Sequence, residues 1–208
     1  MKLFRKKPKP TKYKSLTVKD YQIIYPILRK SITDYMNQAS IYDMQELAST
    51  VLNIPYEDVI DLPAEEIEKL QWLINEPLTK AIEQKNQIVL FGKEINHVKL
   101  FSQVIVTGQA QNFEAILKQI ENPLKTAEVR EQFYDRPPDE NGELTEASKQ
   151  FIEDVFEGRI MQMHKLAAIF LQPIWSNSKF NAAKVNELAE LLLNENVHDV
   201  CTIMFFFA

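Results

Sequence analysis

Residues 54–73, IPYEDVIDLPAEEIEKLQWL, contain two prolines at a spacing that predicts two short helices in close succession. Pro55 and Pro63 each stand where a helix begins, because the first turn of a helix needs no N–H from that position. Ile67 and Leu70 recur at helical spacing, so one face of the segment must be covered by other elements. We therefore expect the helices before and after this stretch to pack around it.

The composition is that of an ordinary soluble globular protein, with 208 residues of which 45% are hydrophobic and 25% charged. Only four residues are glycine, which disfavours phosphate-binding loops. The single cysteine, Cys201, excludes an internal disulfide. The chain has no apolar run of the roughly 18 residues that a membrane helix needs. The basic N-terminus is not followed by an apolar stretch, so we expect neither a membrane span nor a signal peptide.

The charge is distributed unevenly along the chain. Seven of the 24 basic residues and none of the 29 acidic ones lie in residues 1–14, which leaves the rest of the chain with a formal charge of −12. A basic arm on an acidic body is suited to docking on an anionic protein surface or on nucleic acid, and the alternative is a solvated tail. The arm residues that we select as interface candidates are Arg5, Lys6, Lys7, Lys9 and Lys12.

Residues 15–86 have helical periodicity. Thr17 and Asp20 mark a helix start, and we expect Pro26 to kink or split that helix. Ser40 begins the next helix.

The pattern changes in residues 87–98. Ile88–Phe91 and Glu94–Val98 alternate like strands, and a turn at Gly92–Lys93 with glycine first fits a type II′ hairpin. An isolated hairpin is only marginally stable, so it must pack on the helices or on a neighbouring subunit. Phe91 and Lys93 are therefore further interface candidates.

Residues 99–208 return to helical spacing. We expect two helices with a break at Thr107–Gly108, and Glu121–Asn122–Pro123 ends the second of them. Residues 134–144, with two prolines, one glycine and several acids, predict a long loop.

The second half of this region begins with a helix that is capped by Thr145. We expect this helix to continue past Gly158 into the apolar run 160–175, which Pro173 ends. Asn181 opens another helix, whose inner face carries Val185, Leu188, Leu191 and Leu192.

The chain closes on an unusually apolar segment, Val197–Ala208, that contains three consecutive phenylalanines, Phe205, Phe206 and Phe207. An exposed apolar terminus promotes aggregation, so these side chains are expected either in the core of the chain or in a contact between subunits.

Residues with catalytic potential form no familiar pattern. His97, His164 and His198 lack metal-ligand spacing, and Cys201 has apolar and acidic neighbours that would not activate a thiol. The nucleotide-binding, nucleophile-elbow and zinc-protease motifs are absent from the sequence. We therefore predict no catalytic, cofactor or metal site, and a binding or assembly protein rather than an enzyme.

Several phrases resemble structural proteins of tailed bacteriophages, and most closely the neck, ring or tail-assembly components of crAss-like phages. The phrases are LTVKDYQ (residues 16–22), LASTVLNIPYEDVI (47–60), DLPA (61–64), FGK (91–93) and TGQ (107–109). The chain departs from that pattern in its basic arm and at Ala110.

This resemblance implies a non-enzymatic subunit of a ring in the virion neck or tail, such as a head–tail connector. Such a subunit would assemble with its own copies and with portal or other neck and tail proteins, in the host cytoplasm before it enters the virion. The apolar C-terminus, the hairpin and the arm would supply its contacts. Two alternatives remain: a tail-assembly chaperone, and a small DNA-binding regulator that uses residues 1–14.

The sequence thus predicts a mainly α fold: a helical domain with one small β-hairpin, an extended N-terminal arm and an apolar C-terminal tail. We divide the chain into an arm (1–14), an N-terminal helical part (15–86), a hairpin (87–98) and a C-terminal helical part (99–208), with the two helical parts in one domain.

Overall fold

The computed structural model describes residues 16–33, 41–60, 62, 88–135 and 144–207. The described chain is mostly helical and contains one two-stranded antiparallel sheet, which confirms the predicted fold class. The expected arm of residues 1–14, the second helix of the 54–73 stretch and most of the acidic loop lie outside the described residues.

The elements have the following bounds. The N-terminal part contains α1 (Val18–Thr33), α2 (Ile41–Leu52) and α3 (Tyr56–Val59). The middle contains β1 (Ile88–Leu90), β2 (Lys93–Ile95), α5 (His97–Phe101), α6 (Thr107–Glu121), the 3-10 helix η1 (Asn122–Leu124), α7 (Ala127–Arg130) and the π-helical turn η2 (Glu131–Asp135). The last part contains α8 (Glu146–Met161), α9 (Met163–Trp175), α10 (Ala182–Leu192) and α11 (Val197–Phe207).

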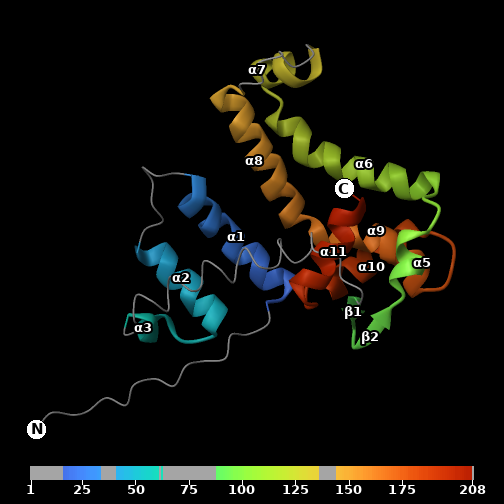
Figure 1. Cartoon of the computed structure of the whole chain (residues 1–208), viewed down its shortest axis with the longest axis horizontal. Coiled ribbons are helices and arrows are strands. Elements are labelled where there is room, and N and C mark those ends of the chain that lie inside the picture. Colours follow the sequence, from blue (N-terminus) through green and yellow to red (C-terminus); the bar gives the residue numbers. More distant parts are fainter. Residues whose placement is uncertain (1–15, 34–40, 61, 63–87, 136–143, 208) are drawn as a thin grey trace, which may run out of the picture.

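Helix α9 is the centre of the fold (Figure 1). From Met163 to Gln172 every residue except Lys165 is buried, because α5, α6, α8, α10 and α11 all contact this helix. A helix that is apolar on all sides is stable only when it is surrounded in this way. In the described part of the 54–73 stretch, by contrast, α3 contributes one buried side chain, Val59. The core is therefore built around α9.

The N-terminal helices join the same core. Tyr21 and Ile24 of α1 and Leu47 of α2 are fully buried and belong to one cluster with the buried side chains of α9 and α11. The predicted start of α1 is confirmed: the backbone N–H of Thr17 donates to Asp20 Oδ2 (3.1 Å), and the N–H of Asp20 donates to Thr17 Oγ1 (3.2 Å). This reciprocal pair satisfies two amides that the helix itself leaves free.

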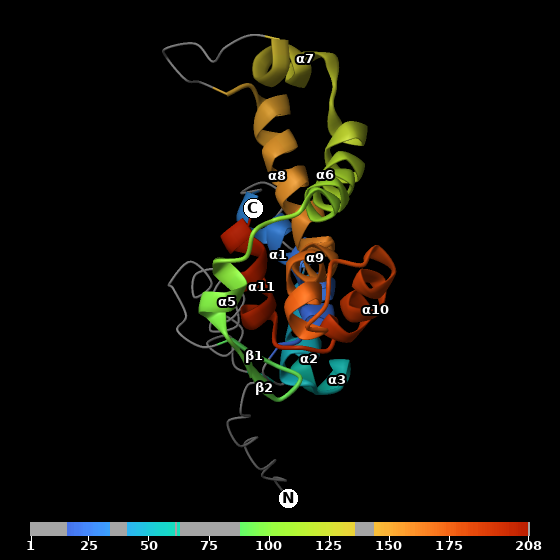
Figure 2. The ribbon, with the colours of Figure 1, turned by 90° about the vertical axis from the view of Figure 1, so that its right-hand side faces the viewer.

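Helices α6, α7 and α8 form a projection from the core, with α7 at its far end (Figure 2). Helices α6 and α8 contact each other directly. Gly158 of α8 allows this contact, because a Cβ at this position would lie 2.3 Å from Ile120 Cγ2 of α6. The predicted N-cap of α8 is also confirmed, since Thr145 Oγ1 accepts from the N–H of Ser148.

The hairpin is present, but its turn lies one residue earlier than predicted. Leu90 pairs with Lys93, so the turn residues are Phe91 and Gly92, with φ of 53° and 68°. Two positive φ values define a type I′ turn, not type II′. The N–H of Phe91 donates to Glu195 Oε2 (2.8 Å), which helps to hold a non-glycine residue in this conformation.

Two prolines lie inside helices, and of the kink or split expected at Pro26 the split does not occur. Pro26 lies inside α1, which runs through it without a split, because Ile24 and Ile27 are buried on either side and packing holds the helix together. Pro173 does not end the apolar helix, since α9 continues to Trp175.

Three boundaries also differ. The break after α5 comprises residues 102–106, and Thr107–Gly108 opens α6 instead of interrupting it. The helix that passes Gly158 ends at Met161, and a turn at Gln162 separates it from α9. Asn181 caps α10 as predicted, but Leu191 is 54% exposed and not on the inner face. None of the described helices is both long and apolar enough to cross a membrane.

Candidate protein-binding groove

A groove of about 1120 Å³ lies between the α5–α6 connection and the end of α9 with the turn that follows it. Gln103, Val106 and Gln109 line the first wall. Ile174, Asn177 and Phe180 line the opposite wall. The two walls come from segments about 70 residues apart in the sequence, so the groove exists only in the folded chain.

The first wall is attached to α9 at a defect that Pro173 creates. In a regular helix the carbonyl of Ile169 accepts from the N–H of residue 173, but proline has none. The side-chain Nε2 of Gln109 donates to that carbonyl instead (3.1 Å). The same side chain uses its Oε1 to accept from the N–H of Val106 (3.1 Å), which caps α6. Gln109 is 1% exposed, so its amide is committed to these contacts.

A second glutamine strengthens the attachment. The Nε2 of Gln103 donates to the carbonyl of Phe170 (3.1 Å) and to that of Leu100 (3.0 Å). Its Oε1 accepts from Gln109 Nε2 at 3.3 Å. A buried polar group is stable only when its hydrogen bonds are satisfied, so this network fixes the path of residues 103–109.

The opposite wall is held by a third glutamine, Gln172, which is buried. Gln172 Oε1 accepts from the N–H of Asn181 (2.8 Å), and its Nε2 donates to Ser176 Oγ (2.8 Å). The two walls are close at Gly108, where an added Cβ would lie 3.0 Å from Phe180 Cδ1. A larger residue at position 108 would therefore press against the phenyl ring.

A run of aliphatic side chains stands beside the groove. Val104 is 86% exposed, Ile105 46% and Val106 47%, and we call residues 104–106 the aliphatic ridge. Val98 of α5, at 63%, is exposed next to this connection. Three consecutive exposed aliphatic residues in a segment fixed by hydrogen bonds are typical of a surface that binds another protein.

The groove also has a definite charge. Lys99 and Lys179 line it, and neither makes an ion pair with any described residue. The described lining contains no aspartate, glutamate, histidine or cysteine. The groove therefore offers cationic, amide and apolar contacts, and no acid–base pair or metal-ligand set.

The described lining of the groove contains none of the candidates chosen from the sequence. Arg5, Lys6, Lys7, Lys9 and Lys12 are outside the described residues. Phe205, Phe206 and Phe207 belong to α11, and their side chains are outside the described part of the chain. Phe91 packs on Trp175 with the ring centroids 4.7 Å apart, and Lys93 Nζ lies 5.4 Å from the centroid of the same indole. Phe91 and Lys93 thus share the indole of Trp175, and neither of them is in the described lining of the groove.

The buried ionisable groups Cys201 and His164 pack in the core, and burial disfavours the charged form of each. Cys201 is buried with its Sγ 3.8 Å from Met163 Sδ, and burial raises the pKa of the thiol to about 12. Burial lowers the pKa of His164 to about 4, with a smaller contribution from Lys165, and its Nδ1 accepts from Gln22 Nε2 at 3.1 Å. Among the described residues, no group of three or more histidine, cysteine, aspartate or glutamate side chains is placed to hold a metal ion.

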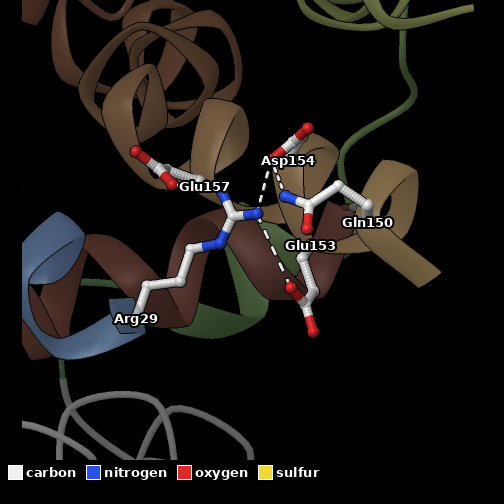
Figure 3. A network of polar contacts seen from close by, with 5 residues as sticks. All are labelled: Arg29, Gln150, Glu153, Asp154 and Glu157. Atoms are coloured by element: carbon white, nitrogen blue, oxygen red, sulfur yellow. Dashed lines mark hydrogen bonds and ion pairs between the residues drawn. The ribbon is translucent and has the colours of Figure 1, made fainter. Parts of the chain in front are cut away.

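A separate polar cluster joins α1 to α8 (Figure 3). The guanidinium of Arg29 pairs with Glu157 and Asp154, and Glu153 lies 3.6 Å away. Gln150 Nε2 donates to Asp154 Oδ1 at 2.9 Å. Bonds to the two carboxylates raise the pKa of Arg29 against the opposing effect of desolvation, which is the largest single influence. The cluster fastens the two helices together.

The groove residues were not among the candidates from the sequence. The predicted helix that precedes Thr107–Gly108 includes the ridge, whereas in the structure residues 104–106 lie in the connection between α5 and α6. A proline within an apolar helix and glutamines in a neighbouring segment were signals of the attachment, but their pairing over 60 residues cannot be obtained from spacing.

Comparison with known proteins finds no matching family model, no matching curated protein and no matching solved structure.

Proposed function

We propose that this chain is a non-enzymatic assembly subunit that binds other protein chains, and that it forms part of a ring in the neck or tail of a crAss-like phage. The observation that carries the proposal is the aliphatic ridge, with Val104 86% exposed, at a groove whose described lining contains no acidic residue. Exposed apolar surface next to a shaped groove supplies the desolvated contacts that dominate interface energy.

The attachment of the ridge supports this function. Gln103 and Gln109 hold residues 103–109 on α9 through side-chain hydrogen bonds. A binding surface that is ordered before it meets its partner loses less conformational entropy on association. A rigid ridge therefore suits permanent contacts between subunits.

The phage assignment is supported by the sequence phrases in residues 16–22 and 47–60 that resemble neck and ring proteins. In that setting the partners are further copies of the chain and portal or other neck and tail proteins. The location is the virion neck or tail, after assembly in the host cytoplasm.

A tail-assembly chaperone is the second candidate, because an exposed aliphatic surface also serves a transient binder. A DNA-binding regulator is the third, favoured by the seven basic residues in positions 1–14. Salt-titrated DNA binding tests the regulator: seven phosphate contacts give a steep loss of affinity with rising salt, which deletion of residues 1–14 removes.

The solution mass tests the assembly function. We expect the wild-type protein to form a defined oligomer in sedimentation velocity, and the double variant Val104→Asp/Ile105→Asp to sediment as a monomer. The control is Leu191→Asp, which places one such charge at an exposed leucine of α10. A wild-type protein that stays monomeric at every concentration would contradict a self-assembling ring and favour the chaperone.

A further inference from the structure

The far end of the projection carries a surface that complements the groove. We call residues 127–135, which form α7 and η2, the tip. The tip contains Glu128, Glu131 and Asp135 against Arg130, a formal charge of −2. Phe133 is 39% exposed and Tyr134 51% exposed. An acidic surface with two aromatic side chains is thus presented at the end of the molecule.

The tip aromatics are positioned by neighbours even though they are exposed. The ring of Phe133 packs on that of Phe151 with the centroids 5.8 Å apart. Lys125 Nζ lies 4.4 Å from the centroid of the Tyr134 ring. These contacts fix the direction of both rings without covering them, and large aromatic side chains are preferred anchors in protein interfaces.

The groove has the opposite character. Its two lysines, Lys99 and Lys179, give it a charge of +2 with no described acidic residue in the lining. Its apolar part, with Val106, Ile174 and Phe180, is suited to aromatic side chains. The tip residues are net acidic and the described groove lining is basic, so the two surfaces carry charges of opposite sign.

The tip of a chain cannot reach the groove of the same chain. Gly108 and Gln109, in the first turn of α6, line the groove, whereas the tip follows the last turn of that helix. A helix of 15 residues is about 22 Å long, and Figures 1 and 2 both show α7 well away from α5. The complementary surfaces lie at opposite ends of one rigid element.

We propose that the tip of one copy of this chain docks in the groove of the next copy. Phe133 and Tyr134 lie against the apolar wall and the aliphatic ridge, and Glu128 and Asp135 face Lys99 and Lys179. The contact joins two different surfaces, so it repeats head to tail and produces a closed ring or a filament. This inference rests on the proposed assembly function and names its partner, a second copy.

A charge exchange tests the contact. The groove variant is Lys99→Glu/Lys179→Glu, and the tip variant is Glu128→Lys/Asp135→Lys. All four positions are exposed, so circular dichroism and melting should match the wild type. In sedimentation velocity we expect each variant alone to associate at least about tenfold more weakly than the wild type, because like charges meet at the contact. An equimolar mixture should recover association, since each altered surface then meets a complementary one.

The control is Lys184→Glu, an exposed lysine of α10 that does not line the groove, and it should associate like the wild type. A wild-type oligomer that both charge variants retain would overturn the tip–groove contact and leave the assembly function intact. A mixture that fails to recover association would also overturn it. Loss of the oligomer in the ridge variant Val104→Asp/Ile105→Asp alone would show that a surface other than the tip occupies the ridge.

Discussion

The side-chain Nε2 of Gln109 lies 3.1 Å from the carbonyl oxygen of Ile169, the acceptor that Pro173 leaves without its helical donor. A defect in the central helix is thereby converted into an attachment point for the segment that forms the groove. The relationship explains why a proline is compatible with the most buried helix of the fold.

Replacing Gln109 by leucine should lower the free energy of unfolding by about 1–3 kcal/mol, because the Ile169 carbonyl and the Val106 N–H lose a buried partner. In a Pro173→Ala background the helix supplies an N–H to Ile169, so the same change should cost less. Urea unfolding of the four proteins of this cycle measures the difference. Gln119→Leu, at an exposed position of α6, is the control, and equal costs in both backgrounds would contradict the role of Pro173.

The buried histidine of α9 should make stability depend on pH. Burial holds the pKa of His164 at about 4, below the value near 6.5 of the unfolded chain. The unfolded state therefore binds more protons between these values, so the contribution of neutral His164 is complete above about pH 6.5 and is lost as the pH falls toward 4.

We expect His164→Gln to reduce the slope of unfolding free energy against pH in this window, which for one group is at most about 1.4 kcal/mol per pH unit. Urea titrations between pH 4.5 and 7.5 measure it. Parallel curves for the variant and the wild type would show that other groups set the acid sensitivity.

The hydroxyl of Tyr21 is buried, and no described residue makes a hydrogen bond to it. Burial, with smaller effects from Cys201 and Tyr25, raises the pKa of this phenol. Removing an unsatisfied polar atom from a core relieves its desolvation cost, so Tyr21→Phe should leave the free energy of unfolding unchanged or raise it by about 1 kcal/mol. Thermal unfolding is the measurement. A loss of 1 kcal/mol or more would indicate a hydrogen-bond partner in the part of the chain outside the described residues.

The contact between α6 and α8 should be sensitive to one methyl group. A Cβ at position 158 would lie 2.3 Å from Ile120 Cγ2, so Gly158→Ala should destabilise the protein by about 1–2 kcal/mol despite the better helix propensity of alanine. Chemical denaturation of the single variant is compared with that of Gly158→Ala/Ile120→Ala. If Gly158→Ala lowers the free energy of unfolding equally when Ile120 is shortened to alanine, a clash with the Ile120 side chain is not the cause of the destabilisation.

Local chemistry allowed several elements to be predicted from the sequence. The caps at Thr17, Thr145 and Asn181 depend on residues within three positions of each helix start, and all three were recognised. The hairpin was found from its alternation. The predicted turn is one residue late because a type II′ turn needs glycine as its first residue, whereas here Phe91 adopts a positive φ beside Glu195, 104 residues away.

The groove could not be predicted for the same reason. Val104, Ile105 and Val106 continue an apolar pattern, and only the hydrogen bonds of Gln103 and Gln109 to α9 show that they are held outward. These bonds join residues 60 to 67 positions apart, a separation at which spacing carries no information.

The attachment of residues 102–109 has a consequence for the order in which the molecule forms and opens. The connection contributes exposed valine and isoleucine and is held chiefly by two amide side chains, so its local unfolding should require less free energy than that of α9. In native-state hydrogen exchange the amide of Val106 should exchange before those of the α9 core. The segment can therefore join the fold only after α9 has presented its free carbonyl, so the binding face forms after the central helix and opens before it.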